Sequence, residues 1–268
     1  MACKVCPPAL TTSCWFIRIV FMKQPLFDNE LFFAEYKKLR ESSDSFNVLL
    51  EQPAFLAMLP HLPGKRVLDL GCGFGAACRE YERLGAVSVI GLDAAEKMLA
   101  EARLLTDSHN IQYLQMDLNN VTGLEGPFDL ITSSLTLHYV LDFPQVVKAV
   151  WDRLAPGGHF VFSQEHPLTT APMDGPKYCY DWEGRLLHYK LADYGREGLR
   201  QTHWFIDGVQ KEHRTFSSLV NALINVGFQI EQTAEPLPSA EAVKVNPGLA
   251  KEFHKPSFLI IRAYKPGI

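Results

Sequence analysis

Residues 66–75 read Arg66-Val67-Leu68-Asp69-Leu70-Gly71-Cys72-Gly73-Phe74-Gly75, a short apolar run that leads into a glycine-rich loop. A nearly continuous apolar run of this length is typical of a strand buried on both faces of a parallel sheet. The next residues, 76–84, have a helical pattern that ends at Gly85. Glycines between a strand and a helix let a ligand approach the backbone, and the helix N-terminus favours a polar or anionic group. This stretch therefore predicts a strand–loop–helix unit with a ligand site at the loop.

The same alternation of short apolar runs and amphipathic segments continues along the chain. It predicts further strands over residues 87–92, 111–114, 128–133, 159–163, 228–232 and 258–264, and helices over 28–39, 48–59, 94–105, 144–154 and 215–226. Strands that alternate with helices of this length indicate βαβ units. We therefore predict an α/β fold, Rossmann-like and doubly wound, with a mostly parallel seven-stranded sheet. The last two strands are expected to pair antiparallel at one end of it.

Changes in composition divide the chain into five segments. We expect a loose N-terminal tail over residues 1–22, a helical lid over 23–63 and a ligand-binding core over 64–167. An aromatic-rich cap is expected as an insertion over 168–213, and a helix and strands over 214–268 complete the sheet. The tail holds Cys3 and Cys6, but no second Cys/His pair lies nearby at zinc-ligand spacing, so no metal is predicted. Met22 is an alternative initiator.

Composition excludes several classes of protein. The 268 residues include 30 acidic and 26 basic ones, and a net charge of −4 argues against broad electrostatic capture of nucleic acid. The apolar run over 15–22 is short and contains Arg18, so no membrane span is expected. Cys72, Cys78 and Cys179 show no disulfide framework, which makes the cytoplasm the expected location. The sequence does not define an oligomeric state.

The glycine loop alone is compatible with two cofactors. A dinucleotide fingerprint requires a further glycine three places after Gly73, where this chain has Ala76. Asp93 lies 22 residues after Gly71, at the end of a predicted strand, and a carboxylate there can hold ribose hydroxyls of either cofactor. A nicotinamide-dependent oxidoreductase is therefore one alternative at this point.

Residues 67–75 resemble the first motif of class I S-adenosylmethionine-dependent methyltransferases, and four later segments resemble further motifs of that family. Residues 91–99 are similar to the second motif, and Asp117-Leu118 to the turn that contacts adenine. Residues 128–139 resemble the fourth-strand motif, and 154–158 the turn before strand five. The five motifs lie in the family's order, and they indicate a small-molecule enzyme of the ubiquinone and menaquinone methyltransferase type.

The resemblance implies a role for each matching position in binding S-adenosyl-L-methionine. Gly71 and Gly73 would pass under the methionine part while Asp69 organises the loop, and Asp93 would take both ribose hydroxyls. Asp117 would accept a hydrogen bond from the adenine amino group. The other implied cofactor contacts are Cys72, Ala94, Met98, Leu118, Ser133, Ser134 and Leu135. Tyr36 and Arg40, one turn apart on the predicted lid helix, would close over the cofactor. Arg40 would bind its carboxylate, or it is simply a solvated surface charge.

Methyl transfer needs a base only if the acceptor arrives protonated. Three histidines are candidates: His138 after the fourth strand, His166 after the fifth and His213 at the exit of the cap. Imidazole titrates near neutral pH, which suits proton removal. Alternatively, His138 is a packing residue near the cofactor. The cap aromatics either surround an aromatic or cationic acceptor or form the small core of the cap itself.

The predicted reaction is methyl transfer to an oxygen, nitrogen or carbon nucleophile of a small molecule. The chain lacks the Asp/Asn-Pro-Pro-aromatic motif of enzymes that methylate amino groups of nucleic acids. A non-catalytic S-adenosylmethionine-binding protein is a further alternative, although Asp69, Asp93 and Asp117 are all present.

Overall fold

A seven-stranded sheet forms the centre of the computed structural model, which describes residues 28–120, 124–175 and 177–267. Its strands are β1 (Arg66–Leu70), β2 (Ser88–Asp93), β3 (Ile111–Gln115), β4 (Phe128–Ser133), β5 (Leu154–Glu165), β10 (Gln229–Ala234) and β11 (Phe258–Tyr264). They lie in the order β10-β11-β5-β4-β1-β2-β3. The predicted fold class is confirmed, and the bounds of β1, β4 and β11 match the predicted ones.

The chain reverses direction across the sheet at β1. Strand β1 pairs in parallel with β2 on one side and with β4 on the other, and β11 runs antiparallel to both β5 and β10. In open α/β sheets, ligands bind beyond the carboxyl ends of the strands at such a switch point. The topology therefore directs a site to the ends of β1 and β4, at Leu70 and Ser133.

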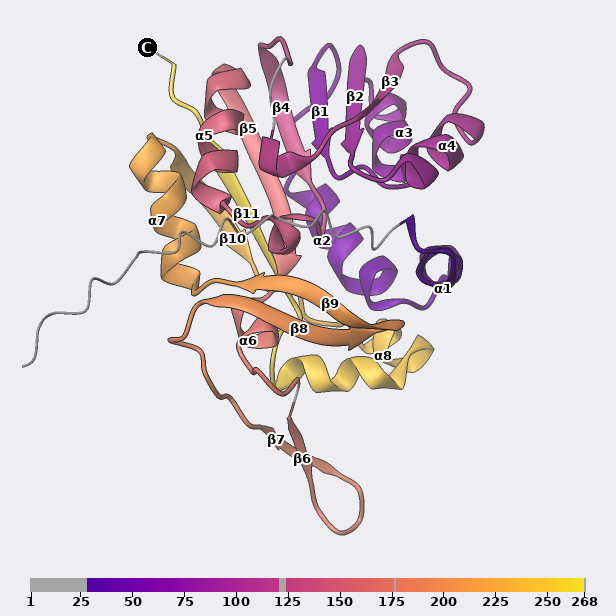
Figure 1. The fold of residues 1–268 in the computed structure, drawn as a ribbon, viewed down its shortest axis with the longest axis vertical. Helices are drawn as coiled ribbons and strands as arrows, with labels where there is room; N and C mark the ends of the chain where they lie inside the picture. The colour runs from indigo at the N-terminus through magenta and orange to yellow at the C-terminus, as the bar shows by residue number, and fades with distance from the viewer. Residues whose placement is uncertain (1–27, 121–123, 176, 268) are drawn as a thin grey trace, which may run out of the picture.

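Helices cover both faces of the sheet (Figure 1). Helices α5 (Phe143–Arg153) and α7 (Phe216–Val226) pack on one face, in a core that includes Leu68 and Leu70 of β1. Helices α3 (Ala76–Arg83) and α4 (Glu96–Leu104) pack on the other face, in a core that includes Val67. Side chains of a strand alternate between its faces, so the apolar run of β1 supplies both cores and holds the loop after it rigidly.

The predicted lid contains two helices and one irregular turn. Helix α1 (Glu30–Glu41) is capped by Asn29, whose side chain accepts a hydrogen bond from the N–H of Phe32. The predicted helix over 48–59 is instead a π-helical turn (Asn47–Glu51) followed by α2 (Gln52–Ala57). Pro53 in the first turn of α2 cannot donate a hydrogen bond to the carbonyl four residues earlier, which interrupts a regular helical ladder. Single π turns of this kind occur frequently at functional sites.

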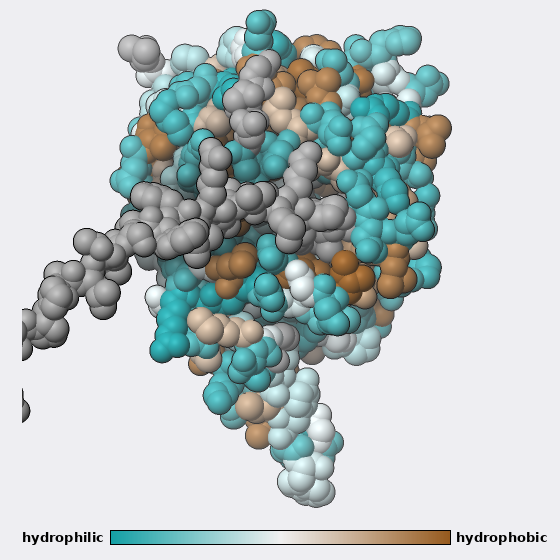
Figure 2. All heavy atoms as spheres, viewed as in Figure 1, coloured by the Kyte–Doolittle hydropathy of each residue, from teal (hydrophilic) through white to brown (hydrophobic). Residues whose placement is uncertain are grey.

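The predicted cap region contains α6 (Pro167–Thr170) and two antiparallel hairpins. The hairpin of β6 (Tyr178–Tyr180) and β7 (Leu186–Tyr189) projects from the body, as Figures 1 and 2 show at the bottom of the view. The hairpin of β8 (Gly198–Trp204) and β9 (Ile206–His213) crosses the end of the sheet that also carries the lid. Thus the lid and one cap hairpin both border the predicted ligand site.

Helix α8 (Ala240–Val245) and a 3-10 helix (Pro247–Phe253) connect β10 to β11. On the face shown in Figure 2, apolar residues form separate patches among hydrophilic ones. None of the described helices is long and apolar enough to cross a bilayer. The predictions for residues 1–22, including Cys3, Cys6 and Met22, lie outside the described residues.

The glycine at the start of α3 generates a first prediction. Gly75 has φ +71°, and a Cβ there would lie 2.1 Å from the hydroxyl oxygen of Tyr113. We expect Gly75→Ala to combine left-handed backbone strain with this clash and to lower the free energy of unfolding by at least about 2 kcal/mol. Gly64→Ala is the matched control, because Gly64 has φ +79° but nothing within 4 Å of an added Cβ. Urea unfolding measures both, and equal losses would contradict the proposed clash.

Candidate active site

A cavity of about 870 Å³ lies beyond the carboxyl ends of β1, β2 and β4. The lid, the glycine loop, the segment after β4 and strands β8 and β9 all contribute to its lining. Every cofactor contact implied by the resemblance lines it except Ser133, namely Tyr36, Arg40, Asp69, Gly71, Cys72, Gly73, Asp93, Ala94, Met98, Asp117, Leu118, Ser134 and Leu135. Residues scattered over a hundred positions of the sequence thus meet at one site.

Ser133 is buried and does not line the cavity. Its hydroxyl donates a hydrogen bond of 2.8 Å to the carbonyl oxygen of Leu70. This bond joins the ends of β4 and β1, so the side chain holds the two strands together instead of facing the cavity. The neighbouring Ser134 faces the cavity in its place.

The glycine loop is shaped for close approach of a ligand. Gly71 and Gly73 have φ values of +76° and +52°, which favour glycine. The N–H groups of Gly71 and Cys72 donate to the carbonyl of Leu92 at the end of β2. A Cβ at Gly71 would lie 2.2 Å from the Thr136 hydroxyl, whereas one at Gly73 would meet nothing within 4 Å. Gly73 therefore leaves open space toward the cavity, as a ligand passing over the loop requires.

Asp93 connects the loop to the second strand. One carboxylate oxygen accepts from the N–H of Gly73 and the other from the N–H of Ala95, both at 2.9 Å. Each carboxylate oxygen can accept a further hydrogen bond. Burial raises the pKa of Asp93 and the backbone donors oppose that rise. The carboxylate is therefore oriented by the backbone and able to accept from a pair of vicinal hydroxyls.

Asp69 is the buried carboxylate at the base of the loop. It accepts hydrogen bonds from the Thr132 hydroxyl at 2.8 Å and from the Cys78 thiol at 3.6 Å. Burial raises the pKa of Asp69 to about 6, although both hydrogen bonds act in the opposite direction. A carboxyl group kept in this environment is a cost to folding, which favours a role in ligand binding.

At the adenine end predicted from the motifs, Asp117, Leu118 and Met98 lie along the cavity. Leu118 and Met98 are almost fully buried, and Asp117 accepts from the N–H and the side-chain amide of Asn119. Asn119 in turn accepts from the N–H of Leu141. Asn119 and Leu141 also line the cavity, and no pattern in the sequence marked them.

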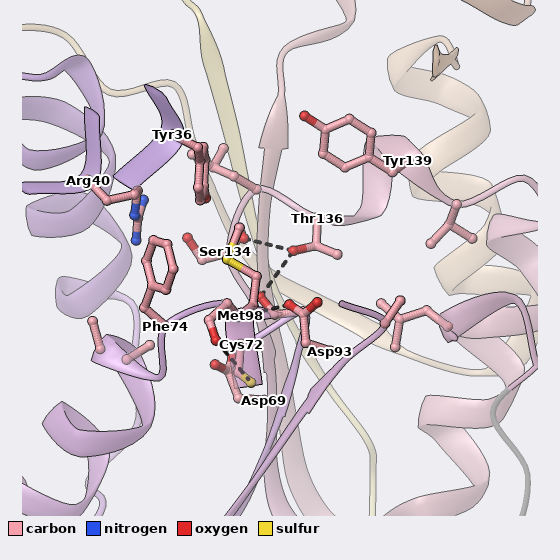
Figure 3. Close-up of a pocket in the computed structure, with 18 of the residues that line it drawn as sticks. Tyr36, Arg40, Asp69, Cys72, Phe74, Asp93, Met98, Ser134, Thr136 and Tyr139 are labelled. Carbon is pink, nitrogen blue, oxygen red and sulfur yellow. Dashed lines mark hydrogen bonds between the residues drawn. The ribbon is translucent and has the colours of Figure 1, made fainter. Parts of the chain in front are cut away.

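The lid and the cap meet over the opposite side of the cavity. Tyr36 packs against Phe74 of the loop and against Trp204 of β8, at ring-centroid distances of 5.9 and 5.8 Å. Figure 3 shows Tyr36, Arg40 and Phe74 together on the lid side, with Tyr139 across from them. Trp204 belongs to a small core with Phe32 and Val209, whereas Tyr180 of the projecting hairpin is 57% exposed. Several cap aromatics therefore stabilise the cap against the lid.

The three candidate histidines do not line the cavity. Burial lowers the pKa of His138 to about 4, and its ring lies 4.2 Å from that of Tyr139. His166 caps α6 through Nδ1 and pairs with Glu235 through Nε2 at 2.8 Å. His213 makes hydrogen bonds with the Thr170 hydroxyl and the Tyr194 carbonyl. Each ring thus has a structural partner, and a catalytic role for any of them stays a prediction.

A buried carboxylate that sequence reasoning missed lies at the lid side of the cavity. Glu51, on the π turn, has no exposed surface and lines the cavity. It accepts from Ser134 Oγ at 2.9 Å, from Ser163 Oγ at 2.5 Å and from Asn47 Nδ2 at 2.6 Å. Asn47 also accepts from Arg40 at 2.5 Å. Only the unusual turn before Pro53 marks this position, and a single sequence does not show it.

The described part of the chain contains no group of three or more His, Cys, Asp or Glu side chains arranged to hold a metal ion. The polar groups that converge on the cavity are instead carboxylates, hydroxyls and backbone amides. These groups suit an organic ligand with hydroxyls and a cationic centre.

Known proteins resemble this chain over its core and, in two cases, over most of its length. Residues 68–162 match the family described as "Methyltransferase domain". An S-adenosylmethionine-dependent methyltransferase from Mesorhizobium loti is 43% identical, with a TM-score of 0.76, and the match covers 84% of this chain and 99% of that one. A protein of Haemophilus influenzae described as uncharacterized is 37% identical over 91% of this chain and 98% of its own length. A ubiquinone biosynthesis O-methyltransferase from Acinetobacter baumannii is 37% identical over only 38% of this chain and 44% of that enzyme.

The glycine loop alone was compatible with a nicotinamide cofactor or with S-adenosyl-L-methionine. These matches, together with the site, identify S-adenosyl-L-methionine as the methyl donor. The Mesorhizobium loti protein is similar along almost its whole length, and the cavity collects the residues that the family's motifs assign to this donor. The chain is therefore a member of the class I S-adenosylmethionine-dependent methyltransferases.

Proposed function

We propose that this enzyme transfers the methyl group to an oxygen, nitrogen or carbon nucleophile of a small molecule by in-line displacement. One observation carries the proposal. A single cavity continues from the glycine loop and Asp93, past Tyr139 in the turn after β4, to Leu199 and Lys211 of the cap. The first part of the cavity suits the donor, and the part under the cap provides a partly enclosed place for an acceptor.

The residues implied by the resemblance each contact a different part of the donor. In this proposal Asp93 accepts from the ribose hydroxyls, Asp117 accepts from the adenine amino group, and Arg40 binds the carboxylate. S-adenosyl-L-methionine, when bound, supplies a methyl group already activated by a sulfonium. The chain's own contribution is to align the acceptor and to exclude water, which together supply much of the rate in such reactions. The packing of Tyr36 against Phe74 and Trp204 is suited to excluding water.

The surface and the relatives support a small acceptor. The net charge of −4 does not favour a polyanionic substrate. The partial match to a ubiquinone biosynthesis O-methyltransferase covers the donor-binding core, and it makes a hydroxyl group the first acceptor to test.

A direct test combines binding with turnover. We expect calorimetry to show binding of S-adenosylmethionine and S-adenosylhomocysteine but not of NADH. Release of S-adenosylhomocysteine is then measured with phenols, catechols, amines and carboxylic acids, and at least one small acceptor should support it. Methylation of protein or RNA in place of every small molecule would contradict the proposal.

The ribose contact can be tested by removing one charge. We expect Asp93→Asn to weaken binding of S-adenosylhomocysteine about 10- to 100-fold, because it loses charge-assisted hydrogen bonds to the ligand and to Gly73. The matched control is Asp129→Asn. Asp129 accepts from the N–H of Arg66, at the start of β1 and outside the cavity lining. Calorimetry should give the control a dissociation constant within about twofold of wild type, and equal effects of the two substitutions would refute the role of Asp93.

Asp69 predicts a dependence of stability on pH. The pKa of Asp69 is about 6 in the folded chain, above the ordinary aspartate value of 3.8, so its ionisation opposes folding. The penalty is absent below about pH 4 and complete above about pH 6. Asp69→Asn should therefore raise the free energy of unfolding by about 2 to 3 kcal/mol at pH 7.5 and by much less at pH 4. Urea unfolding across this range measures the difference, and a variant less stable than wild type at pH 7.5 would contradict it.

A further inference from the structure

The proposed function leaves open where a proton on the acceptor goes. None of the three histidines lines the cavity, whereas Glu51 and Ser134 do. Ser134 follows β4, in the segment that the family resemblance places at the methionine end of the donor. Its hydroxyl donates directly to Oε1 of Glu51 at 2.9 Å. A hydroxyl that faces the cavity therefore has a carboxylate behind it.

The segment that carries Ser134 is held in one conformation. Leu135 has φ +52°, a left-handed conformation that is strained for a side chain of this kind. Its N–H donates to Ser163, and the Thr136 hydroxyl donates to the Ser134 carbonyl at 3.0 Å. Figure 3 shows Ser134 between the lid residues and Thr136. Strain retained at such a position indicates that its geometry serves function.

Hydrogen bonds also fix both carboxylate oxygens of Glu51. Ser163 Oγ donates to the same oxygen as Ser134, and Asn47 Nδ2 donates to the other. Burial raises the pKa of Glu51, while these three hydrogen bonds and the charge of Arg40 oppose the rise. The other titratable groups that interact with Glu51 electrostatically are Tyr36 of α1, Asp69 of β1 and Tyr81 of α3. A carboxylate whose affinity for protons is raised toward neutrality is suited to act as a base.

We propose that Ser134 and Glu51 together form the proton-accepting pair of this methyltransferase, a proposal that rests on the proposed small-molecule function. The acceptor's proton passes to Ser134 Oγ while Ser134 gives its own proton to Glu51. The acceptor's electron pair forms the bond to the methyl carbon as the carbon–sulfur bond breaks, and the sulfur keeps that pair. Ser134 is regenerated, the donor leaves as neutral S-adenosylhomocysteine, and Glu51 returns its proton to water after turnover.

Protonation of Glu51 can also be tested by donor binding alone, without a methyl acceptor. The cationic donor favours ionised Glu51, whereas the neutral S-adenosylhomocysteine does not. Across the pH range in which Glu51 titrates, binding of S-adenosylmethionine should therefore release more protons than binding of S-adenosylhomocysteine. Calorimetry in buffers of different ionisation enthalpy measures this difference. It should be clearly smaller in Glu51→Gln, where Asp69 with its pKa of about 6 remains, and an unchanged difference would assign the titration to Asp69 and overturn the proposal.

A double variant separates the proton-accepting role from a structural one. In Glu51→Gln the new amide faces the Asn47 amide, so two donors meet. Combining it with Asn47→Asp restores an acceptor there, beside Arg40, and keeps the local charge. We expect the double variant to regain the melting temperature of wild type without regaining the extra proton release. Recovery of both would show that Glu51 acts only through lid structure.

Kinetics on an acceptor found in the panel give the second test. Glu51→Gln should lower kcat at least about 100-fold with little change in the dissociation constant of S-adenosylhomocysteine, which is neutral and does not favour ionised Glu51. Ser134→Ala and Ser163→Ala form a matched pair, because each removes one hydroxyl from Oε1 of Glu51 but only Ser134 lines the cavity. Only Ser134→Ala should slow transfer strongly, and equal effects would contradict the relay. If no small molecule is methylated, the proposed function fails. The proton release on donor binding then still tests whether Glu51 can exchange a proton at the site.

Discussion

The hydrogen bond between Asp93 and the N–H of Gly73 is the interaction on which the site depends. It joins the end of β2 to the loop after β1, at the point where the sheet reverses its order. The loop could not keep three left-handed glycines in place without such an anchor, and the N–H groups of Gly71 and Cys72 provide a second one at Leu92. Because both anchors come from β2, the parallel pairing of β1 with β2 directly sets the geometry of the ligand site.

The charge of the site explains why this loop suits a sulfonium donor better than a dinucleotide. Asp69 and Glu51 are buried carboxylates and Asp93 is a half-buried one at the same cavity, and Asp69 interacts electrostatically with both of the others. A pyrophosphate placed on the loop would meet this negative charge, whereas a sulfonium and an ammonium group would reduce it. Burial raises the pKa of all three acids, so their ionisation in the empty site opposes folding, and a bound cation offsets part of that cost.

Most of the fold could be predicted because the core strands have a clear pattern. The apolar runs of β1, β4 and β11 are buried on both faces, and their predicted bounds agree with the structure. The π turn before Pro53 could not be predicted, since its periodicity differs little from that of a helix. The β8–β9 hairpin of the cap could not be predicted because its aromatic residues pack against the lid, and a contact between distant segments leaves no local period.

The donor half of the site was more predictable than the acceptor half for a related reason. The predicted donor contacts Gly73, Asp93 and Asp117 lie at or just after the ends of strands, so the order of the strands locates them at the cavity. The motif predicted both Ser133 and Ser134 as donor contacts, because a pattern does not show which of two adjacent serines faces the cavity. Glu51 and Lys211 reach the cavity only through the packing of the lid and the cap.

A crystal structure with bound S-adenosylhomocysteine tests the central claim most directly. We predict ribose hydroxyls within about 3 Å of the Asp93 carboxylate and the methionine part over Gly73. The sulfur should face Ser134, with Ser134 still bonded to Glu51. A ligand that lies elsewhere in the cavity, or with its ribose away from Asp93, would contradict this account of the site.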